Sequence, residues 1–350
     1  MQFYDFKEIE ERVILIGVQT EQDEDVAASL DELEELAATA GAVTVGKVIQ
    51  NREAVHPGTY IGKGKIEEVA ALLAAYDANG VICDDELSPA QMNNLERELD
   101  CKVMDRTLLI LDIFAGRATT SEGKIQVELA QLRYRSARLV GLRESLSRLG
   151  GGIGTRGPGE KKLETDRRLI RTRISALKAE LAQVEKHREL IRGKRSRGNL
   201  KTAAIVGYTN AGKSTLLNTL TGAGILAEDK LFATLDPTTR VLELKDGQQI
   251  LLTDTVGFIR KLPHHLVEAF KSTLEEAKYA DYIIHVVDAS NPQAELQMHT
   301  VYETLRELGA TGKKIITLLN KQDQVQGESL RDFRADYTVK CSARTGEGLE

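Results

Sequence analysis

One short stretch near the middle of the chain constrains the fold more than any other. Residues 207–214 are Gly-Tyr-Thr-Asn-Ala-Gly-Lys-Ser, which fits the pattern Gly-x-x-x-x-Gly-Lys-Ser. The apolar residues 203–206 before it are typical of a buried strand, and the apolar spacing of 215–220 is typical of a helix. A strand, this loop and a helix in that order predict a phosphate-binding loop rather than a chance glycine turn.

The residue types of this loop suit the phosphates of a nucleotide. Glycines let backbone N–H groups converge on phosphate oxygens, and the N-terminus of the following helix adds a favourable dipole. Lys213 would reach the β- and γ-phosphates, and the Ser214 hydroxyl would bind Mg²⁺. The nucleotide-binding residues predicted in the loop are Gly207, Tyr208, Thr209, Asn210, Ala211, Gly212, Lys213, Ser214 and Thr215.

Two segments downstream suit the γ-phosphate and a metal ion. Residues 231–240 are polar and contain a proline, and this segment could fold over the γ-phosphate. Residues 249–254 are an expected strand that ends at Asp254, whose carboxylate can hold Mg²⁺ through water, while the Gly257 N–H can bond the γ-phosphate. The residues predicted to bind nucleotide here are Phe232, Ala233, Thr234, Leu235, Asp236, Asp254, Thr255, Val256 and Gly257.

The last part of the chain has features expected to recognise guanine. Strands are expected at 282–288 and 314–319, and the second leads into Asn-Lys-Gln-Asp. The Asp323 carboxylate would accept from the ring N1–H and the exocyclic amine, a pairing that adenine cannot satisfy. A further strand leads into a Ser-Ala-Arg turn. The residues predicted at the base are Asn320, Lys321, Asp323, Ser342, Ala343 and Arg344. Five such signals in order predict a GTP-binding domain over residues 200–350.

Charge is distributed unevenly behind the net value of −6. Residues 133–200 contain 19 Lys and Arg against 7 Asp and Glu, so the rest of the chain is strongly acidic. We favour a polyanion partner for this segment over a merely solvated helical face. There is no apolar run of about 18 residues to span a membrane. The 3 cysteines are widely spaced, which argues against a zinc site and fits a reducing cytoplasm.

Residues 1–120 alternate between strand-like and helix-like segments, which favours a small α/β domain with a parallel sheet. Ser88 and Pro89 are typical of a helix N-cap and first turn. Strands are expected at 12–19, 42–50, 80–83 and 101–104, and helices at 26–40, 65–76 and 88–99.

Residues 121–195 change character and predict a basic antiparallel helical hairpin. Two apolar stripes follow a four-three heptad spacing, which is typical of a coiled coil. Ser136 and Arg143 interrupt the first stripe, and Arg188 interrupts the second. The stripe residues are Ile125, Leu129, Leu132, Leu139 and Leu146, and then Ile170, Ile174, Leu177, Leu181, Val184 and Ile191.

The loop between the two helices, residues 150–160, has six glycines and one proline among eleven residues. A thin glycine tip within a basic collar suits RNA phosphates and splayed bases, although it lacks aromatic residues for stacking. The predicted RNA contacts are Gly151, Gly152, Thr155, Arg156, Gly157, Lys161 and Lys162.

The nucleotide motifs together resemble the translation-factor-related GTPases of the Obg and Era type. The segments Phe-Ala-Thr-Leu-Asp-Pro-Thr-Thr-Arg (232–240) and Gly-Gly-Ile-Gly-Thr-Arg-Gly-Pro-Gly-Glu (151–160), with the preceding α/β domain, resemble the HflX family over nearly the whole chain. The resemblance implies a GTPase that binds the large (50S) ribosomal subunit, with its N-terminal part directed at the catalytic centre of 23S-type rRNA. It also implies the splitting or rescue of stalled ribosomes, especially under heat stress.

The resemblance assigns Thr234 as the switch threonine on Mg²⁺, beside Ser214 and Asp254, with Thr238 and Thr239 as chemical alternatives. The catalytic residues would then be Lys213, Thr234 and Gly257. Two other function classes remain open: a GTPase of ribosome assembly or RNA modification, and a non-ribosomal GTP-dependent scaffold. We expect a cytoplasmic monomer that binds GTP or GDP and Mg²⁺ and does not bind DNA or span a membrane.

Three details bear on mechanism and extent. Phe258 follows Gly257 where many small GTPases carry a glutamine that orients water, so hydrolysis by the protein alone should be slow and stimulated by ribosomes. Asn210 resembles the asparagine that binds K⁺ in some related GTPases, although a structural role in the turn is equally compatible. The chain stops at Glu350, where such a domain would begin its last helix, so we expect a truncated C-terminus.

Overall fold

The computed structural model describes residues 10–21, 25–148, 158–197, 200–222, 224, 231–263, 266, 271–325 and 330–350. For the helical residues 140–148, 158–163, 189, 191–197 and 271–273 it describes the backbone alone. The chain divides into two units. The first comprises residues 1–113 with 131–174, and the second comprises residues 114–130 with 175–350.

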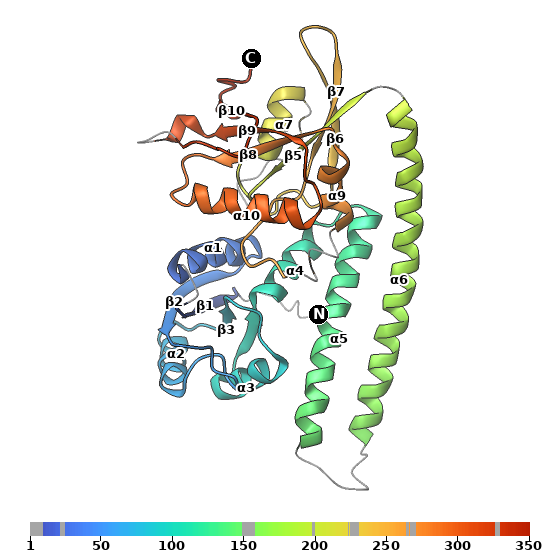
Figure 1. The fold of residues 1–350 in the computed structure, drawn as a ribbon. Coiled ribbons are helices and arrows are strands. Elements are labelled where there is room, and N and C mark those ends of the chain that lie inside the picture. The colour runs from blue at the N-terminus through green and yellow to red at the C-terminus, as the bar shows by residue number, and fades with distance from the viewer. Residues whose placement is uncertain are drawn as a thin grey trace, which may run out of the picture. The chain divides into compact units, whose positions relative to one another are not determined.

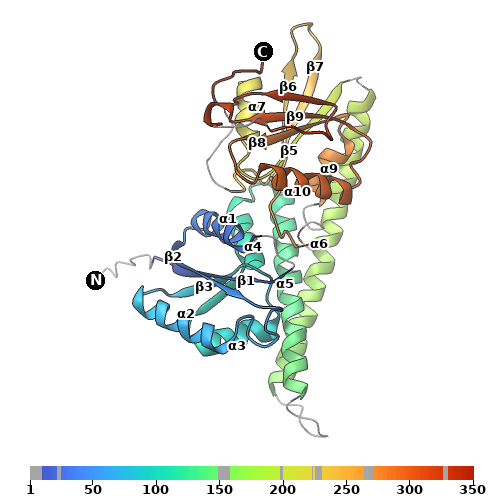
Figure 2. The same cartoon turned by 60° about the vertical axis from the view of Figure 1, so that its left-hand side comes forward.

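The first unit is built on a four-stranded sheet with the order β2-β1-β3-β4, in which all pairs are parallel. This confirms the α/β class and the parallel sheet expected from the alternating pattern. Figures 1 and 2 show helices on both faces of the sheet. Its strands are β1 (Arg12–Gln19), β2 (Val43–Asn51), β3 (Gly80–Cys83) and β4 (Lys102–Asp105).

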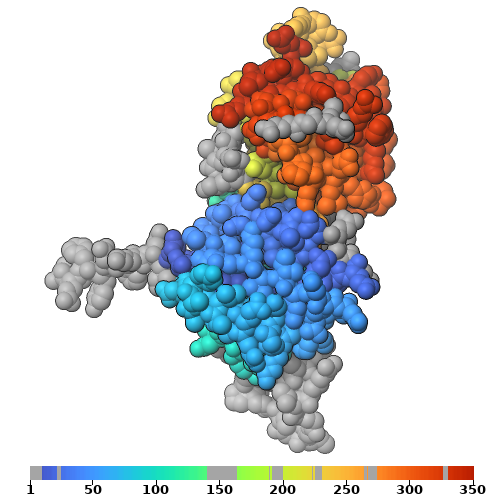
Figure 3. All heavy atoms as spheres, turned by 90° about the vertical axis from the view of Figure 1, so that its left-hand side faces the viewer, coloured from blue at the N-terminus to red at the C-terminus, as the bar shows by residue number. Residues whose placement is uncertain are grey.

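Four helices cover this sheet, and three of them were predicted. Helices α2 and α3 pack on one face over a core that includes Ile14, Ile16 and Val81. Helix α1 lies so close to the other face that a Cβ at Gly17 would be 2.5 Å from Val26. In Figure 3 the blue to cyan atoms of these elements form one continuous body. The helices are α1 (Val26–Thr39), α2 (Lys63–Ala75), α3 (Pro89–Leu99) and α4 (Arg106–Arg117).

Helix α4 was not predicted because it follows β4 without a loop or a capping signal. Apolar residues fill most of the run from 107 to 114, so neither a helical nor a strand period stands out. The predicted cap of α3 is confirmed: Ser88 Oγ accepts from the backbone N–H of Gln91, and the Gln91 side chain accepts from the Ser88 N–H.

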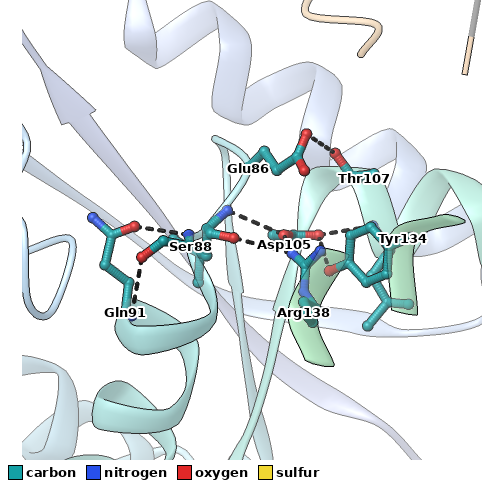
Figure 4. A network of polar contacts seen from close by, with 9 residues as sticks. Glu86, Ser88, Gln91, Asp105, Thr107, Tyr134 and Arg138 are labelled. Carbon is teal, nitrogen blue, oxygen red and sulfur yellow. Dashed lines mark hydrogen bonds and ion pairs between the residues drawn. The ribbon is translucent and has the colours of Figure 1, made fainter. Parts of the chain in front are cut away.

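Asp105, at the end of β4, attaches α5 (Ser121–Arg148) to the first unit. Its buried carboxylate accepts from the Leu87 N–H at 3.1 Å, the Tyr134 hydroxyl at 2.8 Å and the Arg138 guanidinium at 2.5 Å. Figure 4 shows Tyr134 and Arg138 of α5 pointing toward this carboxylate. One acidic side chain thereby joins the loop after β3 to α5.

Helices α5 and α6 (Pro158–Arg197) lie side by side as the predicted hairpin, which both ribbon views show. Between residues 171 and 188, the heptad positions of α6 are buried or half-buried while all others are exposed. The interrupting Arg188 pairs with Glu122 at 2.9 Å. Helix α5 buries a second face, with Val127, Ala130 and Tyr134, which the heptad template did not anticipate because α5 packs on two sides.

Helix α6 begins at Pro158, inside the loop predicted for 150–160. The predicted RNA contacts Gly151, Gly152, Thr155, Arg156 and Gly157 lie outside the described residues. Lys161 and Lys162 lie in the first turns of α6, where only the helical backbone is described.

The second unit contains a six-stranded sheet with the order β10-β9-β8-β5-β7-β6. Its pairs are parallel except for β6 with β7, which is antiparallel. The strands are β5 (Lys201–Gly207), β6 (Thr238–Glu243), β7 (Gln249–Asp254), β8 (Tyr282–Asp288), β9 (Lys314–Asn320) and β10 (Tyr337–Lys340).

Helices sandwich this second sheet. Helix α7 (Lys213–Thr221) buries Leu216 and Leu217 against one face, and α10 (Ala294–Glu307) buries Met298 against the other. Helix α9 (Lys271–Tyr279) packs near β5. Among the helices that the structure describes, none combines the length and apolarity needed to cross a membrane.

Candidate functional site

The predicted motifs converge on the edge of the six-stranded sheet where the parallel strands end. The glycine-rich loop leaves β5, Asp254 ends β7 and Asn320 ends β9. Strand β5 lies between β7 and β8, so the chain changes direction across the sheet at this strand. In open parallel sheets, ligands bind in the crevice at such a switch point, because loops there diverge to opposite faces.

The loop between β5 and α7 needs its glycines for close approach. A Cβ at Gly207 would lie 2.2 Å from the carbonyl oxygen of Val286, and one at Gly212 would lie 2.3 Å from Asn320 Nδ2. Gly212 has a φ of +94° and Asn210 a φ of +60°, both in the left-handed region that Gly and Asn adopt most readily. Asn210 had two interpretations, a K⁺ ligand or a structural residue of the turn, and its φ value fits the structural role.

Lys213 is buried at the start of α7, and its ammonium donates to the carbonyl of Tyr208 at 2.7 Å. Burial lowers the pKa of Lys213 to about 8, while the nearby charge of Asp254 acts in the opposite direction. A Cβ at Gly257 would be 2.7 Å from the Thr209 Cα and 2.9 Å from the Lys213 ammonium. Only glycine at 257 therefore leaves room for this lysine and the loop.

Three predicted metal ligands lie together beside Lys213. The Ser214 hydroxyl is 2.8 Å from the Thr234 hydroxyl and donates to Asp254 Oδ2 at 2.7 Å, and Thr234 Oγ1 is 3.2 Å from the same carboxylate oxygen. Asp254 Oδ1 is buried and has no hydrogen-bond partner. Burial raises the pKa of Asp254, although Lys213 and the two hydroxyls oppose this. Hard oxygen donors around an orphaned carboxylate oxygen fit Mg²⁺.

The alternative threonines, Thr238 and Thr239, lie on β6. Thr239 bonds the Thr253 hydroxyl at 3.0 Å, and Thr238 is the backbone partner of Asp254 in the antiparallel pair. Strand β6 was not predicted, because its first residues belong to the polar, proline-containing segment 231–240 that was expected to fold over the γ-phosphate. Of the three candidates, Thr234 is the one whose hydroxyl reaches both Ser214 and Asp254.

Two neighbouring cavities contain most of the predicted nucleotide-binding residues, and Asn210, Gly212 and Thr215 line both. The smaller has a volume of about 50 Å³, and its other lining residues are Thr209, Lys213, Ser214, Phe232, Ala233, Thr234, Thr255 and Gly257. The larger has a volume of about 460 Å³, and its other lining residues are Asn320, Lys321, Asp323, Gln324, Ser342, Ala343 and Arg344. The first suits phosphates and the second suits a base and ribose.

Asn320 links the phosphate loop to the larger cavity through two hydrogen bonds. Its amide donates to the carbonyl of Ala211 in the glycine-rich loop at 2.8 Å and accepts from the Ala343 N–H at 2.7 Å. Asp323 is exposed in the larger cavity. Lys321 pairs with Asp288 at 2.7 Å. Sequence reasoning did not select Asp288, although its place at the end of an expected strand was a usable signal.

The remaining predicted nucleotide-binding residues line neither cavity. Leu235 and Val256 are buried, Ala211 contributes its carbonyl to Asn320, and Asp236 bonds Thr119 and Thr120. Tyr208 accepts from Lys213 through its carbonyl and from the Arg260 N–H through its hydroxyl. Phe258 is buried and likewise lines neither cavity, so its side chain provides no group that could orient water there.

Three family models match consecutive parts of the chain. Residues 27–115 match a GTP-binding GTPase N-terminal domain, residues 117–195 a GTP-binding GTPase middle region, and residues 202–321 a family described as 50S ribosome-binding GTPase. The first two models together cover the α/β domain from α1 onward and most of the hairpin. The third covers the phosphate loop, the cluster of Ser214, Thr234 and Asp254, and Asn320.

Curated relatives and a solved structure agree with these matches. The chain is 72% identical to GTPase HflX of Lacrimispora saccharolytica over 99% of this chain and 82% of the relative, and 46% identical to GTPase HflX of Escherichia coli over 97% and 80%. A crystal structure of SsGBP in complex with GDP is 27% identical and covers 97% of this chain and 95% of its own, with a TM-score of 0.53. The match over nearly the whole length, together with the phosphate loop and the family models, establishes that this chain is a GTP-hydrolysing member of the HflX GTPase family.

Proposed function

We propose that this GTPase acts on ribosomes, binding the 50S subunit through its RNA and splitting or rescuing stalled ribosomes under stress. The observation that carries the proposal is the match of residues 202–321 to a family described as 50S ribosome-binding GTPase. The excess of basic residues in 133–200 supports an RNA partner, because rRNA presents a dense array of phosphates. The loop at the tip of the hairpin, residues 150–160, would contact that RNA. Its contact residues would be Gly151, Gly152, Thr155, Arg156 and Gly157, followed by Lys161 and Lys162 at the start of α6.

In the reaction that we propose, Lys213 and the N–H of Gly257 bind the γ-phosphate. Ser214, Thr234 and Asp254 would hold Mg²⁺, which would supply positive charge to stabilise the negative charge that develops during phosphoryl transfer. The buried position of Lys213 strengthens its attraction for these oxygens, because water screens it poorly. Asp323 selects guanine, and Asn320 keeps the base cavity in register with the phosphate loop.

Hydrolysis also requires a group that orients the attacking water, and the sequence offers no obvious side chain for this task. Phe258 is buried and cannot polarise water, so we propose that the bound ribosome supplies the group that positions the attacking water. Hydrolysis should therefore be slow in isolated protein and faster with 50S particles. We also propose that Asn210 can bind K⁺, and equal rates in K⁺ and Na⁺ would contradict that assignment.

The experiment that tests the proposal is co-sedimentation with purified 50S and 70S particles, with a non-hydrolysable GTP analogue or GDP, at two salt concentrations. We expect analogue-dependent, salt-sensitive binding to 50S, stimulated GTP hydrolysis, and conversion of 70S into subunits. A matched variant, Arg156→Ala, should weaken binding to 50S while the hydrolysis rate of the protein alone stays unchanged.

Each other outcome identifies a different error. Binding in neither nucleotide state would refute the ribosomal role and direct attention to protein partners of the hairpin. A preference for precursor RNA over mature 50S particles would favour a role in assembly. Binding to 50S without conversion of 70S would reject splitting and retain the 50S interaction.

A further inference from the structure

Asp236 lies two residues after Thr234, yet its side chain binds a distant part of the same unit. Its Oδ2 accepts from the Thr119 N–H at 3.0 Å, the Thr119 hydroxyl at 2.7 Å and the Thr120 N–H at 2.9 Å. Its Oδ1 accepts from the Thr120 hydroxyl at 2.5 Å. Thr119 and Thr120 immediately precede α5, so one carboxylate holds the start of the hairpin with both of its oxygens.

The surroundings of this carboxylate favour its charged form and its position. Partial burial raises the pKa of Asp236, but the bonds from Thr120 and Thr119 outweigh it and leave the pKa below its ordinary value. A Cβ at Gly123 would be 2.4 Å from Asp236 Oδ1, so a side chain at that position would displace the carboxylate. The backbone of α5 comes this close only because residue 123 is glycine.

A second contact anchors the other side of Thr234. Phe232 packs edge-on against Phe114 with ring centroids 4.7 Å apart, and both rings are buried. The Phe232 N–H also donates to the Thr209 hydroxyl of the phosphate loop at 2.9 Å. Phe232 has a φ of +54°, a conformation that costs energy for an aromatic residue and persists only where the surroundings hold it. Thr234 therefore lies between two anchors that both contact residues 114–120.

Holding Thr234 matters because a metal ligand on an irregular segment must be ordered before it can act. The segment 231–237 has no strand or helix of its own to fix it before β6 begins at Thr238. The contacts of Asp236 and Phe232 provide that order from outside the segment. Without these contacts, the segment would have to become ordered when GTP and Mg²⁺ bind, and this would weaken their binding.

We propose that Asp236 is a positioning residue of GTP hydrolysis, which holds Thr234 beside Ser214 and Asp254 by binding Thr119 and Thr120 at the start of α5. This inference rests on the proposed role of Thr234 as a metal ligand. Because coupling between two equilibria is reciprocal, GTP and Mg²⁺ in turn strengthen the contact between Asp236 and α5. The start of the hairpin is thereby sensitive to the state of the nucleotide.

The test compares three variants of the full chain with a matched control. Asp236→Ala removes the acceptor, and the double substitution Thr119→Val with Thr120→Val removes both hydroxyl donors from the other side. Asp281→Ala is the control, because Asp281 also accepts from a threonine N–H and hydroxyl, those of Thr202, at 2.8 and 3.0 Å. Asp281 lies before β8, at the opposite end of the sheet from the phosphate loop. Thr234→Ala tests the underlying metal role.

The measurements are the affinities for a non-hydrolysable GTP analogue and for GDP, the Mg²⁺ concentration for half-maximal hydrolysis, and the Tm. We expect Asp236→Ala to reduce the analogue-to-GDP affinity ratio by about tenfold and to raise the Mg²⁺ requirement. The Thr119 and Thr120 double variant should shift both in the same direction, and its effect should not add to that of Asp236→Ala. Asp281→Ala should lower the Tm alone.

Two outcomes would overturn the inference, and they differ in whether the metal role of Thr234 also fails. If Thr234→Ala changes the ratio but Asp236→Ala and the double threonine variant do not, the contact is structural and the metal role stands. If Thr234→Ala also leaves the ratio unchanged, the metal role of Thr234 fails and the positioning role fails with it. The double threonine variant decides the matter even if Asp236→Ala does not fold.

Discussion

The two sheets of this protein, the first parallel throughout and the second parallel except for β6 with β7, end in polar edges of opposite character. At the first sheet, Asp84 after β3 accepts from Ser29 at 2.7 Å and pairs with Arg106 at 3.0 Å. Asp105 at the end of β4 accepts from Leu87, Tyr134 and Arg138. These buried carboxylates bind side chains of neighbouring helices. At the second sheet, Asp254 at the end of β7 keeps one oxygen without a hydrogen-bond partner, while its other oxygen accepts from Ser214, which lines the smaller cavity.

The difference shows what converts the edge of an α/β sheet into a ligand site. Both edges carry carboxylates at the ends of parallel strands, as the topology favours. At the first edge, arginine and tyrosine side chains occupy the space in front of the strands and turn it into an attachment point for α5. At the second edge, Gly207, Gly212 and Gly257 have no side chains, so the loop after β5 packs closely against Val286, Asn320 and Lys213 and no bulky side chain fills the edge. Acidic residues alone therefore do not mark the functional edge.

The strongest test of this comparison is Asp254→Asn. We expect GTP hydrolysis to fall by about 1000-fold, because the metal loses a charged oxygen ligand at the place where charge develops. The Tm of nucleotide-free protein should stay the same or rise, since burial penalises the ionised carboxylate. Hydrolysis rates at saturating Mg²⁺ and thermal unfolding check the two parts. A large fall in Tm would show that this edge, too, is structural.

The counterpart at the first edge is Asp105→Asn. We expect the free energy of unfolding to fall by about 3 kcal/mol, because the buried end of Arg138 loses its charged partner. Denaturant unfolding followed by circular dichroism measures this change. Arg138→Met, with the carboxylate retained, provides the reciprocal variant. An unchanged stability would contradict the interpretation of the first edge as an attachment point.

Substitution of Asp323 tests the selectivity of the second edge. Asp323→Asn should weaken GTP binding by about 100-fold, because an amide cannot accept from both guanine N–H groups. The same variant should gain affinity for xanthosine triphosphate, whose 2-oxo group accepts from the amide. Competition between the two nucleotides in a fluorescence assay measures the switch. An unchanged preference for guanine would show that Asp323 does not recognise the base.

The smallest expected effect is a pH dependence of GTP affinity, which follows from the titration of Lys213. Lys213 has a pKa of about 8 against an ordinary value of 10.5, so it loses its proton in nucleotide-free protein above pH 8. GTP affinity should then fall by up to about tenfold per pH unit, because phosphate binding requires the charged form. Between pH 8 and 10.5 the unfolded chain holds more protons at this lysine than the folded protein, so its contribution to stability rises with pH.

Titration of GTP affinity from pH 7 to 9.5 by calorimetry tests this expectation. Lys213→Arg retains the charge throughout this range and provides the control, although its affinity is lower at every pH. A wild-type curve parallel to that of the variant would show that Lys213 keeps its proton in the free protein.

Local sequence pattern was sufficient for much of the fold. The expected strands 249–254 and 282–288 coincide with β7 and β8, and 12–19 and 80–83 coincide with β1 and β3. These segments are short apolar runs with clear polar boundaries, so their period and ends are visible without tertiary information. The failures, α4 and β6, lack such boundaries: α4 begins directly after β4, and β6 begins inside a polar segment.

By itself, the sequence determined most of the strands and helices, the phosphate loop and the family, because each depends on residues close together in the chain. Tertiary structure alone decided which of three threonines meets Ser214 and Asp254, and that Asp236 turns toward Thr119 and Thr120, 117 and 116 residues away. It also decided that Asp105 anchors a helix while Asp254 keeps an open oxygen. The reason is that a carboxylate's role depends on the donors that packing brings to it from distant segments, and no local spacing records them.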